Sequence, residues 1–128
     1  MAFNVLIVDD SQTMRKVIRK SVVISGFDLG DCWEAGNGQE ALKVVSLHGI
    51  DLILADLNMP VMNGLEMIRE LRKKEAYCHI PVILITTEGS EKRLEEAYAV
   101  GIKSYIQKPF HPEVLRGILN QVMEKNHV

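Results

Sequence analysis

The sequence predicts an α/β fold: a single domain with a doubly wound, five-stranded parallel sheet and five helices, in the flavodoxin-like strand order 2-1-3-4-5. Short apolar runs alternate with helical patterns along the chain, which is typical of strands joined by right-handed helical crossovers. Several runs are continuously apolar and rich in β-branched residues, as strands buried on both faces are. The chain has 128 residues and no linker or internal repeat, so we expect one domain over residues 1–128.

The first strand is predicted at residues 5–8, because this run is apolar throughout and too short for a helix. A helix is predicted over residues 12–24, where apolar side chains follow a helical stripe and basic ones mostly fall off it. Gly26 and Gly30 then bracket a loop that leads into the next strand. Residues 32–35 form a shorter, more mixed run, which favours an edge strand.

Turn and capping residues delimit the later elements. Asn37-Gly38 leads into a helix that ends near residue 47, and Asn63-Gly64 opens one that ends near residue 74. Ser90 is a suitable N-cap for the fourth helix, which Gly101 closes. The remaining elements are three strands and a final amphipathic helix, predicted at residues 52–56, 82–86 and 104–107 and from Pro112 onward.

Composition narrows the function classes. The net charge is −2 with acids and bases interspersed, so there is no basic footprint for nucleic acid and no polybasic membrane patch. The N-terminus carries only a short apolar stretch before two acids, which predicts neither a signal peptide nor a membrane span. Cys32 and Cys78 lie in no metal-type spacing and are expected to be reduced thiols. We therefore expect a cytoplasmic, protein-facing role.

Acidic residues follow two of the predicted strands. Asp9 and Asp10 end the first apolar run, and Asp56 ends the third. If these strands are neighbours, each pair of carboxylates about 5 Å apart repels by roughly 3 kcal/mol at an effective dielectric of about 20. Three oxygen donors without His or Cys favour a hard cation, and Mg²⁺ is the usual one that recruits a phosphate. Thr86 and Lys108 also stand at predicted strand ends, so the sequence predicts metal-assisted phosphate chemistry at this sheet edge.

The placement of these residues resembles the receiver domain of two-component response regulators. Five separate motifs carry the resemblance, which spans essentially the whole chain: Val8-Asp9-Asp10, Asp56, Met59-Pro60 with Gly64, Thr86-Thr87 and Lys108-Pro109-Phe110. Stand-alone chemotaxis receivers are particularly similar, because residues 13–15, residues 58–60 and Glu88 fit them, and we expect no appended output domain.

The resemblance implies a role for each strand-end residue. Asp56 would be the nucleophile that accepts a phosphoryl group from a histidine kinase. Asp10 and Asp56 would ligate Mg²⁺ directly, Asp9 mainly through water, and Asn58 through its backbone carbonyl. Lys108, preceding a cis proline, would offset charge on the transferring phosphoryl group.

The resemblance also implies a switch. Thr86 would donate its hydroxyl to the phosphoryl group and Tyr105 would turn inward, while Asn58 and Glu88 would tune dephosphorylation. A partner face would include the following residues around the fourth helix, fifth strand and fifth helix: Lys92, Arg93, Lys103, Tyr105 and Arg116. The expected partners are a histidine kinase or phosphotransfer domain, a downstream protein such as a flagellar motor switch component, and a phosphatase. The protein is expected to be a monomer.

Other classes remain open at this stage. The chain could be a receiver module of a longer regulator or of a phosphorelay. A dehalogenase-type phosphatase also uses an Asp nucleophile with Mg²⁺, but it needs Asp-x-Asp-x-Thr, whereas residues 9–13 read Asp-Asp-Ser-Gln-Thr. A flavin carrier shares the sheet order, yet it needs a neutral phosphate loop where this chain has two acids. Thr87 stands where the receiver family commonly has Ala or Gly, and its bulk would narrow access to Asp56.

Overall fold

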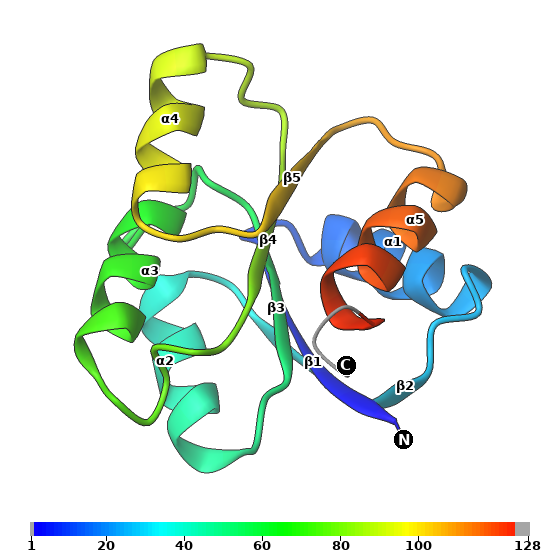
Figure 1. The fold of residues 1–128 in the computed structure, drawn as a ribbon, viewed down its shortest axis with the longest axis horizontal. Helices are drawn as coiled ribbons and strands as arrows, with labels where there is room; N and C mark the ends of the chain where they lie inside the picture. The colour runs from blue at the N-terminus through cyan, green and yellow to red at the C-terminus, as the bar shows by residue number, and fades with distance from the viewer. Residues whose placement is uncertain (1, 125–128) are drawn as a thin grey trace.

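The strands of the described chain form one parallel sheet in the order β2-β1-β3-β4-β5, which confirms the predicted topology (Figure 1). The structure is a computed structural model that describes residues 2–124, so residue 1 and residues 125–128 of the expected domain lie outside it. The strand bounds are β1 (Phe3–Val8), β2 (Leu29–Ala35), β3 (Leu52–Ala55), β4 (Val82–Thr86) and β5 (Ser104–Gln107).

Helices cover both faces of this sheet. On one face lie α1 (Gln12–Ile24) and α5 (Pro112–Glu124). On the other lie α2 (Gly38–Leu47), α3 (Gly64–Lys73) and α4 (Glu91–Ala99) (Figure 1). Among the described residues, no helix is both long enough and apolar enough to cross a bilayer.

The core consists of two layers separated by the sheet. Alternate residues of β1 enter opposite layers: Leu6 and Val8 pack with α2 and α3, whereas Val5 and Ile7 pack with α1 and α5. All four are fully buried. Burial on both faces is the reason that the central strands are apolar without alternation.

Side-chain caps set the starts of four helices. Ser11, Asn37, Asn63 and Ser90 each accept a hydrogen bond from a backbone N–H in the first turn of the helix that follows. Ser90 is the cap predicted from the sequence. The fourth helix is followed by Gly101 at φ +100°, as the sequence also predicts.

The edge strand differs from the prediction. Residues 29–31, predicted as part of a loop, belong to β2, which begins at Leu29. The pairing shifts by one residue between Phe3↔Leu29 and Val5↔Cys32, so the extra residue forms a bulge. The side chain of Asn4 reaches across this bulge and accepts the Asp31 N–H at 2.9 Å. Leu29 therefore pairs with β1 and the bulge spans Gly30 and Asp31, although the composition of this segment indicated a loop.

Val61 has a backbone conformation that is unusual for a β-branched residue. Its φ is 67°, and the Met62 N–H donates to the Pro60 carbonyl at 2.7 Å across it, as in a γ-turn. The side chain is 74% exposed, so burial does not compensate for this strain. We expect Val61→Asn to raise the free energy of unfolding by about 1 kcal/mol, measured by urea denaturation. Val61→Ile keeps the β-branch and should give no gain; equal gains from both variants would contradict the strain.

Candidate functional site

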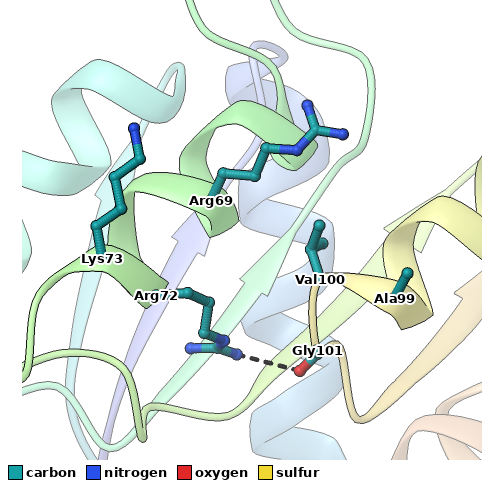
Figure 2. Close-up of a pocket in the computed structure, with 6 residues that line it drawn as sticks. All are labelled: Arg69, Arg72, Lys73, Ala99, Val100 and Gly101. Carbon is teal, nitrogen blue, oxygen red and sulfur yellow. Dashed lines mark hydrogen bonds between the residues drawn. The ribbon is translucent and has the colours of Figure 1, made fainter.

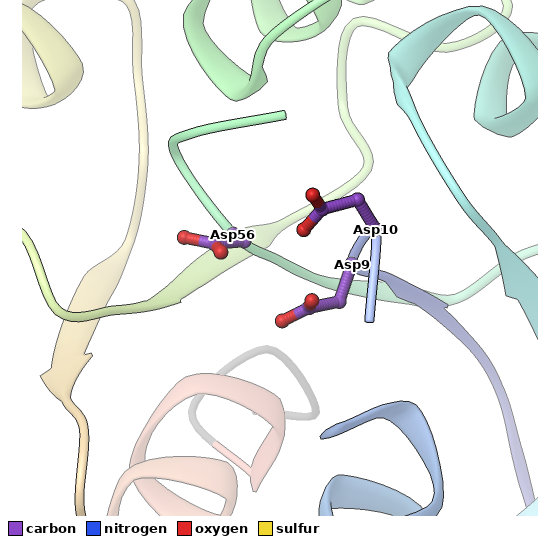
Figure 3. A group of neighbouring side chains, drawn as sticks. All are labelled: Asp9, Asp10 and Asp56. Carbon is purple, nitrogen blue, oxygen red and sulfur yellow. The ribbon is translucent and has the colours of Figure 1, made fainter. Parts of the chain in front are cut away.

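Three carboxylates meet at the carboxyl edge of the sheet. Oxygen atoms of Asp9, Asp10 and Asp56 lie within 4.8 Å of one another (Figure 3). The cause is the register of β1 and β3, in which Val8 pairs with Ala55, so that both strands end at the same level. The Asp56 N–H continues this pairing and donates to the Val8 carbonyl at 2.9 Å. The predicted convergence of the three acids is thus confirmed.

Asp9 is the buried member of the cluster, with 1% exposure. One carboxylate oxygen accepts the Ser11 N–H at 2.9 Å, and the other accepts from the Lys108 ammonium at 2.7 Å. A buried carboxylate is tolerable when it is paired and hydrogen-bonded in this way. Both Asp9 oxygens are therefore engaged within the protein.

Lys108, the residue directly after β5, joins the cluster. Its ammonium lies 2.7 Å from Asp9 and 3.3 Å from Asp56, and its side chain is only 10% exposed. Its backbone N–H donates to the Thr86 carbonyl at 2.8 Å, which extends the β4–β5 pairing to the site. The peptide bond to Pro109 is cis, as the resemblance implied. One cation thus lies between two of the three acids.

Asp56 and Asp10 are the more accessible acids. Asp56 is partly exposed, and one of its oxygens accepts the Asn58 N–H only at a long 3.4 Å. Asp10 is exposed, and its carboxylate accepts no hydrogen bond from residues 2–124. The loop after Asp56 is tightly placed, since a Cβ on Gly64 would approach the Asp56 carbonyl oxygen to 2.6 Å. These two carboxylates are therefore accessible to a ligand, although Asp56 also contacts Lys108.

The donor set fits a hard divalent cation. It consists of the carboxylate oxygens of the three acids, and the exposed Asn58 follows Asp56 by two residues on the adjoining loop. Three acids with one ammonium leave a net negative charge, which a cation would offset. The acidic pocket is therefore consistent with metal binding.

Thr86 ends β4 beside this cluster and is fully buried. Its hydroxyl oxygen accepts the Glu88 N–H at 3.1 Å. The Glu88 carboxylate lies at the start of α4, 3.3 Å from the Ser90 N–H and 3.9 Å from the Arg93 guanidinium. The backbone near Glu88 is thus tied to Thr86, while its side chain is directed to α4.

Comparison with known proteins decides the family. The model of the response regulator receiver domain matches residues 5–120. The chain belongs to the response regulator receiver family. Its relatives include the chemotaxis protein CheY homolog of Campylobacter jejuni, 39% identical over 92% of this chain and 90% of that one, and CheY1 of Helicobacter pylori, 38% identical over 94% and 97%.

Solved structures agree with this receiver assignment. CheY4 of Vibrio cholerae superposes with a TM-score of 0.86 at 34% identity, covering 96% of this chain and 100% of that one. A longer relative, the probable transcriptional regulator ycf29 of Pyropia yezoensis, is 32% identical over 98% of this chain but only 55% of its own length. Receiver domains are signalling modules, so this chain has a phosphorylation-dependent role in two-component signalling, in contact with a kinase and a downstream target.

In this receiver, Tyr105 lies on β5 away from the acids. Its ring is half-buried and meets Tyr98 of α4 edge-on, with 6.4 Å between the centroids. Tyr98, which the sequence reasoning missed, is 49% exposed. The expected partner face has three exposed cations, Lys92, Lys103 and Arg116, whereas its Arg93 contacts Glu88.

Arg15 belongs to residues 13–15, which carry part of the resemblance, but no role was predicted for its side chain. Its guanidinium donates to the Asp9 backbone carbonyl at 2.6 Å and to the Glu34 carboxylate at 2.8 Å. It therefore joins β2, α1 and the residue that begins the acidic cluster. Arg15 is a basic residue off the apolar stripe of α1, and nothing in the local sequence indicated which groups its side chain would contact.

Proposed function

We propose that the protein is a switch that accepts a phosphoryl group on Asp56 from a phosphohistidine of a kinase. A carboxylate oxygen of Asp56 attacks phosphorus, the nitrogen–phosphorus bond breaks, and the leaving imidazole takes up a proton. The observation that carries this proposal is the partly exposed Asp56 beside two further acids and the Lys108 ammonium. The protein would thus catalyse its own modification, without turning over a released substrate.

The remaining charges suit phosphoryl transfer. Asp10, Asp56 and the Asn58 carbonyl would hold Mg²⁺ directly, and Asp9, whose oxygens are both engaged, would act mainly through water. When bound, the ion would supply positive charge that offsets the negative charge on the oxygens of the transferring phosphoryl group. Lys108 is already within 3.3 Å of Asp56, where its ammonium can contact the same group.

Asn58 and Glu88 are proposed to tune the loss of the phosphoryl group by water. Asn58 is exposed on the loop directly after the acceptor strand, where it can limit the approach of a water molecule. Glu88 is turned toward Arg93, so it would act only after that 3.9 Å contact opens. Thr87 is exposed next to Thr86 and adds bulk at the same entrance.

The output is proposed to pass from Thr86 to Tyr105. A phosphoryl group on Asp56 would draw the Thr86 hydroxyl from the Glu88 N–H, and the Tyr105 ring would leave Tyr98 for the vacated space. A coupling of about 1–3 kcal/mol would change partner affinity about 5- to 150-fold. The likeness to chemotaxis proteins supports a flagellar motor switch component as the downstream partner.

The longer Pyropia yezoensis relative favours a second candidate, in which the same switch is the receiver module of a longer regulator or phosphorelay. The chemistry at Asp56 is common to both candidates. They differ in the partner that contacts the face around Tyr105, which binding assays with the phosphorylated protein would distinguish.

Beryllofluoride with Mg²⁺, a stable mimic of the acyl phosphate, tests the switch. We expect amide shifts at Asp56 and Thr86 and also at Tyr98 and Tyr105, because the edge-on ring contact is lost. Tyr105→Ala should abolish the shifts in α4 and keep those at Asp56, whereas Tyr77→Ala, on the loop after α3, should keep both. If the shifts stay beside the acids in the parent, the phosphosite stands but the switch is wrong.

Asp10→Asn tests the electrostatics of the acidic cluster. We expect weaker Mg²⁺ binding, because one direct ligand loses its charge. The metal-free protein should become more stable by about 1 kcal/mol, since Asp10 is exposed and its repulsion is screened. Urea denaturation in chelator measures this gain, with the exposed Asp31→Asn as the control. A destabilised Asp10→Asn protein would show that the cluster is not under repulsion.

A further inference from the structure

A second candidate binding site lies between α3 and the turn from α4 to β5. A groove of about 520 Å³ is lined by Arg69, Arg72 and Lys73 of α3, by Ala99 at the end of α4 and by Val100 and Gly101 of the turn that follows (Figure 2). This volume is in the range of sites that bind small ligands or peptide side chains. None of these residues belongs to the acidic cluster, and the described ionisable groups that line the groove are all cations.

Arg72 gives the groove a fixed wall. Its guanidinium donates to the backbone carbonyls of Cys78, Ile80 and Gly101, each at 3.1 Å. It passes so close to Gly101 that a Cβ there would lie 3.1 Å from its Nε. Because the donors of Arg72 are directed to backbone oxygens, this residue supplies positive charge and rigidity. An anion would instead be bound by the neighbouring Arg69 and Lys73.

Arg69 and Lys73 are the cations available to a ligand. Figure 2 shows both side chains extending away from Gly101, whereas Arg72 turns toward it. Arg69 is exposed and has no ion pair or hydrogen bond with residues 2–124. Lys73 lies 2.9 Å from Glu70, but these side chains are 73% and 40% exposed, and such a pair is weak and easily exchanged.

The rest of the groove is apolar. Val100 is half-buried against the core layer below α3, and Ala99 is exposed beside it. The aliphatic stems of the two arginines extend this apolar surface. An occupant that matches the groove therefore needs an apolar side chain flanked by carboxylates, which is the pattern of acidic peptide motifs recognised by clustered arginines.

We propose that this groove binds a short acidic segment of a partner protein, with an apolar side chain on Val100 and carboxylates on Arg69 and Lys73. The site is separate from the proposed phosphoryl chemistry, and a partner could occupy it while another contacts the face around Tyr105. A nucleic acid is disfavoured as the occupant, because the protein as a whole carries a net charge of −2.

The test uses the full chain and a defined probe, the peptide acetyl-Glu-Glu-Leu-Glu-Glu-amide. We expect the peptide to shift the amides of residues 69–73 and 99–101, with a Kd of about 1 mM or tighter. Replacing its Leu by Ser, or its Glu residues by Gln, should each weaken binding. If the Ser peptide binds as well as the Leu peptide, the attraction is only electrostatic and the groove proposal is wrong.

Protein variants locate the interaction. Arg69→Glu should weaken binding roughly tenfold, since it removes a charge-assisted hydrogen bond and repels the peptide. Lys43→Glu makes the same change of charge at an exposed position on α2 and should leave the Kd unchanged. Arg69→Gln, a milder change, covers the case in which Arg69→Glu disturbs the fold. Equal losses in Arg69→Glu and Lys43→Glu, or no shifts at millimolar peptide, would overturn the proposal.

Discussion

Asp56→Asn is expected to abolish phosphorylation by acetyl phosphate. The amide has nearly the shape of the carboxylate but lacks the anionic oxygen that attacks phosphorus. Mass spectrometry after reaction with Mg²⁺ and acetyl phosphate should show one added phosphoryl group on the parent and none on the variant. The loss should be complete rather than partial, because Asp9 is buried and bound to Lys108 and Ser11, and Asp10 is proposed to hold the metal ion.

Two controls make this result specific. Asp31→Asn makes the same chemical change at an exposed position on β2 and should be labelled as fully as the parent. Asp10→Asn should be labelled more slowly, since it retains the nucleophile and loses a metal ligand. Full labelling of the Asp56→Asn protein would move the acceptor to another residue and would refute the proposed function.

Lys108→Met is expected to have the largest effect on stability. It would leave the buried Asp9 carboxylate without its 2.7 Å partner and would remove the cation that lies 3.3 Å from Asp56. Breaking one side of a buried ion pair costs about 3 kcal/mol, because the remaining charge is uncompensated. Urea denaturation of the metal-free protein measures this loss, and Mg²⁺ should restore part of it.

A double-mutant cycle separates charge from packing. Asp9→Asn should make Lys108→Met much less costly, since the buried acid that needs the ammonium is then neutral. Lys103→Met removes an exposed cation just before β5 and should change the free energy of unfolding little. If Lys108→Met costs the same with and without Asp9, the lysine stabilises the fold through its aliphatic stem and not through the ion pair.

The acidic cluster was predictable because it depends on topology. Continuous apolar runs that end in acids predict strands, and parallel strands bring their carboxyl ends to one edge of the sheet. Strand topology alone was enough to predict that Asp9, Asp10 and Asp56 lie together. It also predicted that Thr86 and Lys108 lie near them. The cap at Ser90 was predictable from local sequence as well, since a short polar side chain before a helical stripe is itself the signal.

Contacts between residues far apart in sequence were decided only by the tertiary structure. At the bulge in β2 the Asn4 side chain accepts the Asp31 N–H, and Arg15 reaches from α1 to Asp9 and to Glu34 of β2. Arg72 donates to two carbonyls between α3 and β4, those of Cys78 and Ile80, and to that of Gly101 between α4 and β5, which packing brings to the same guanidinium. Local pattern determines which elements form and which ends of strands meet, whereas the direction of a long side chain is chosen by partners that packing brings within its reach.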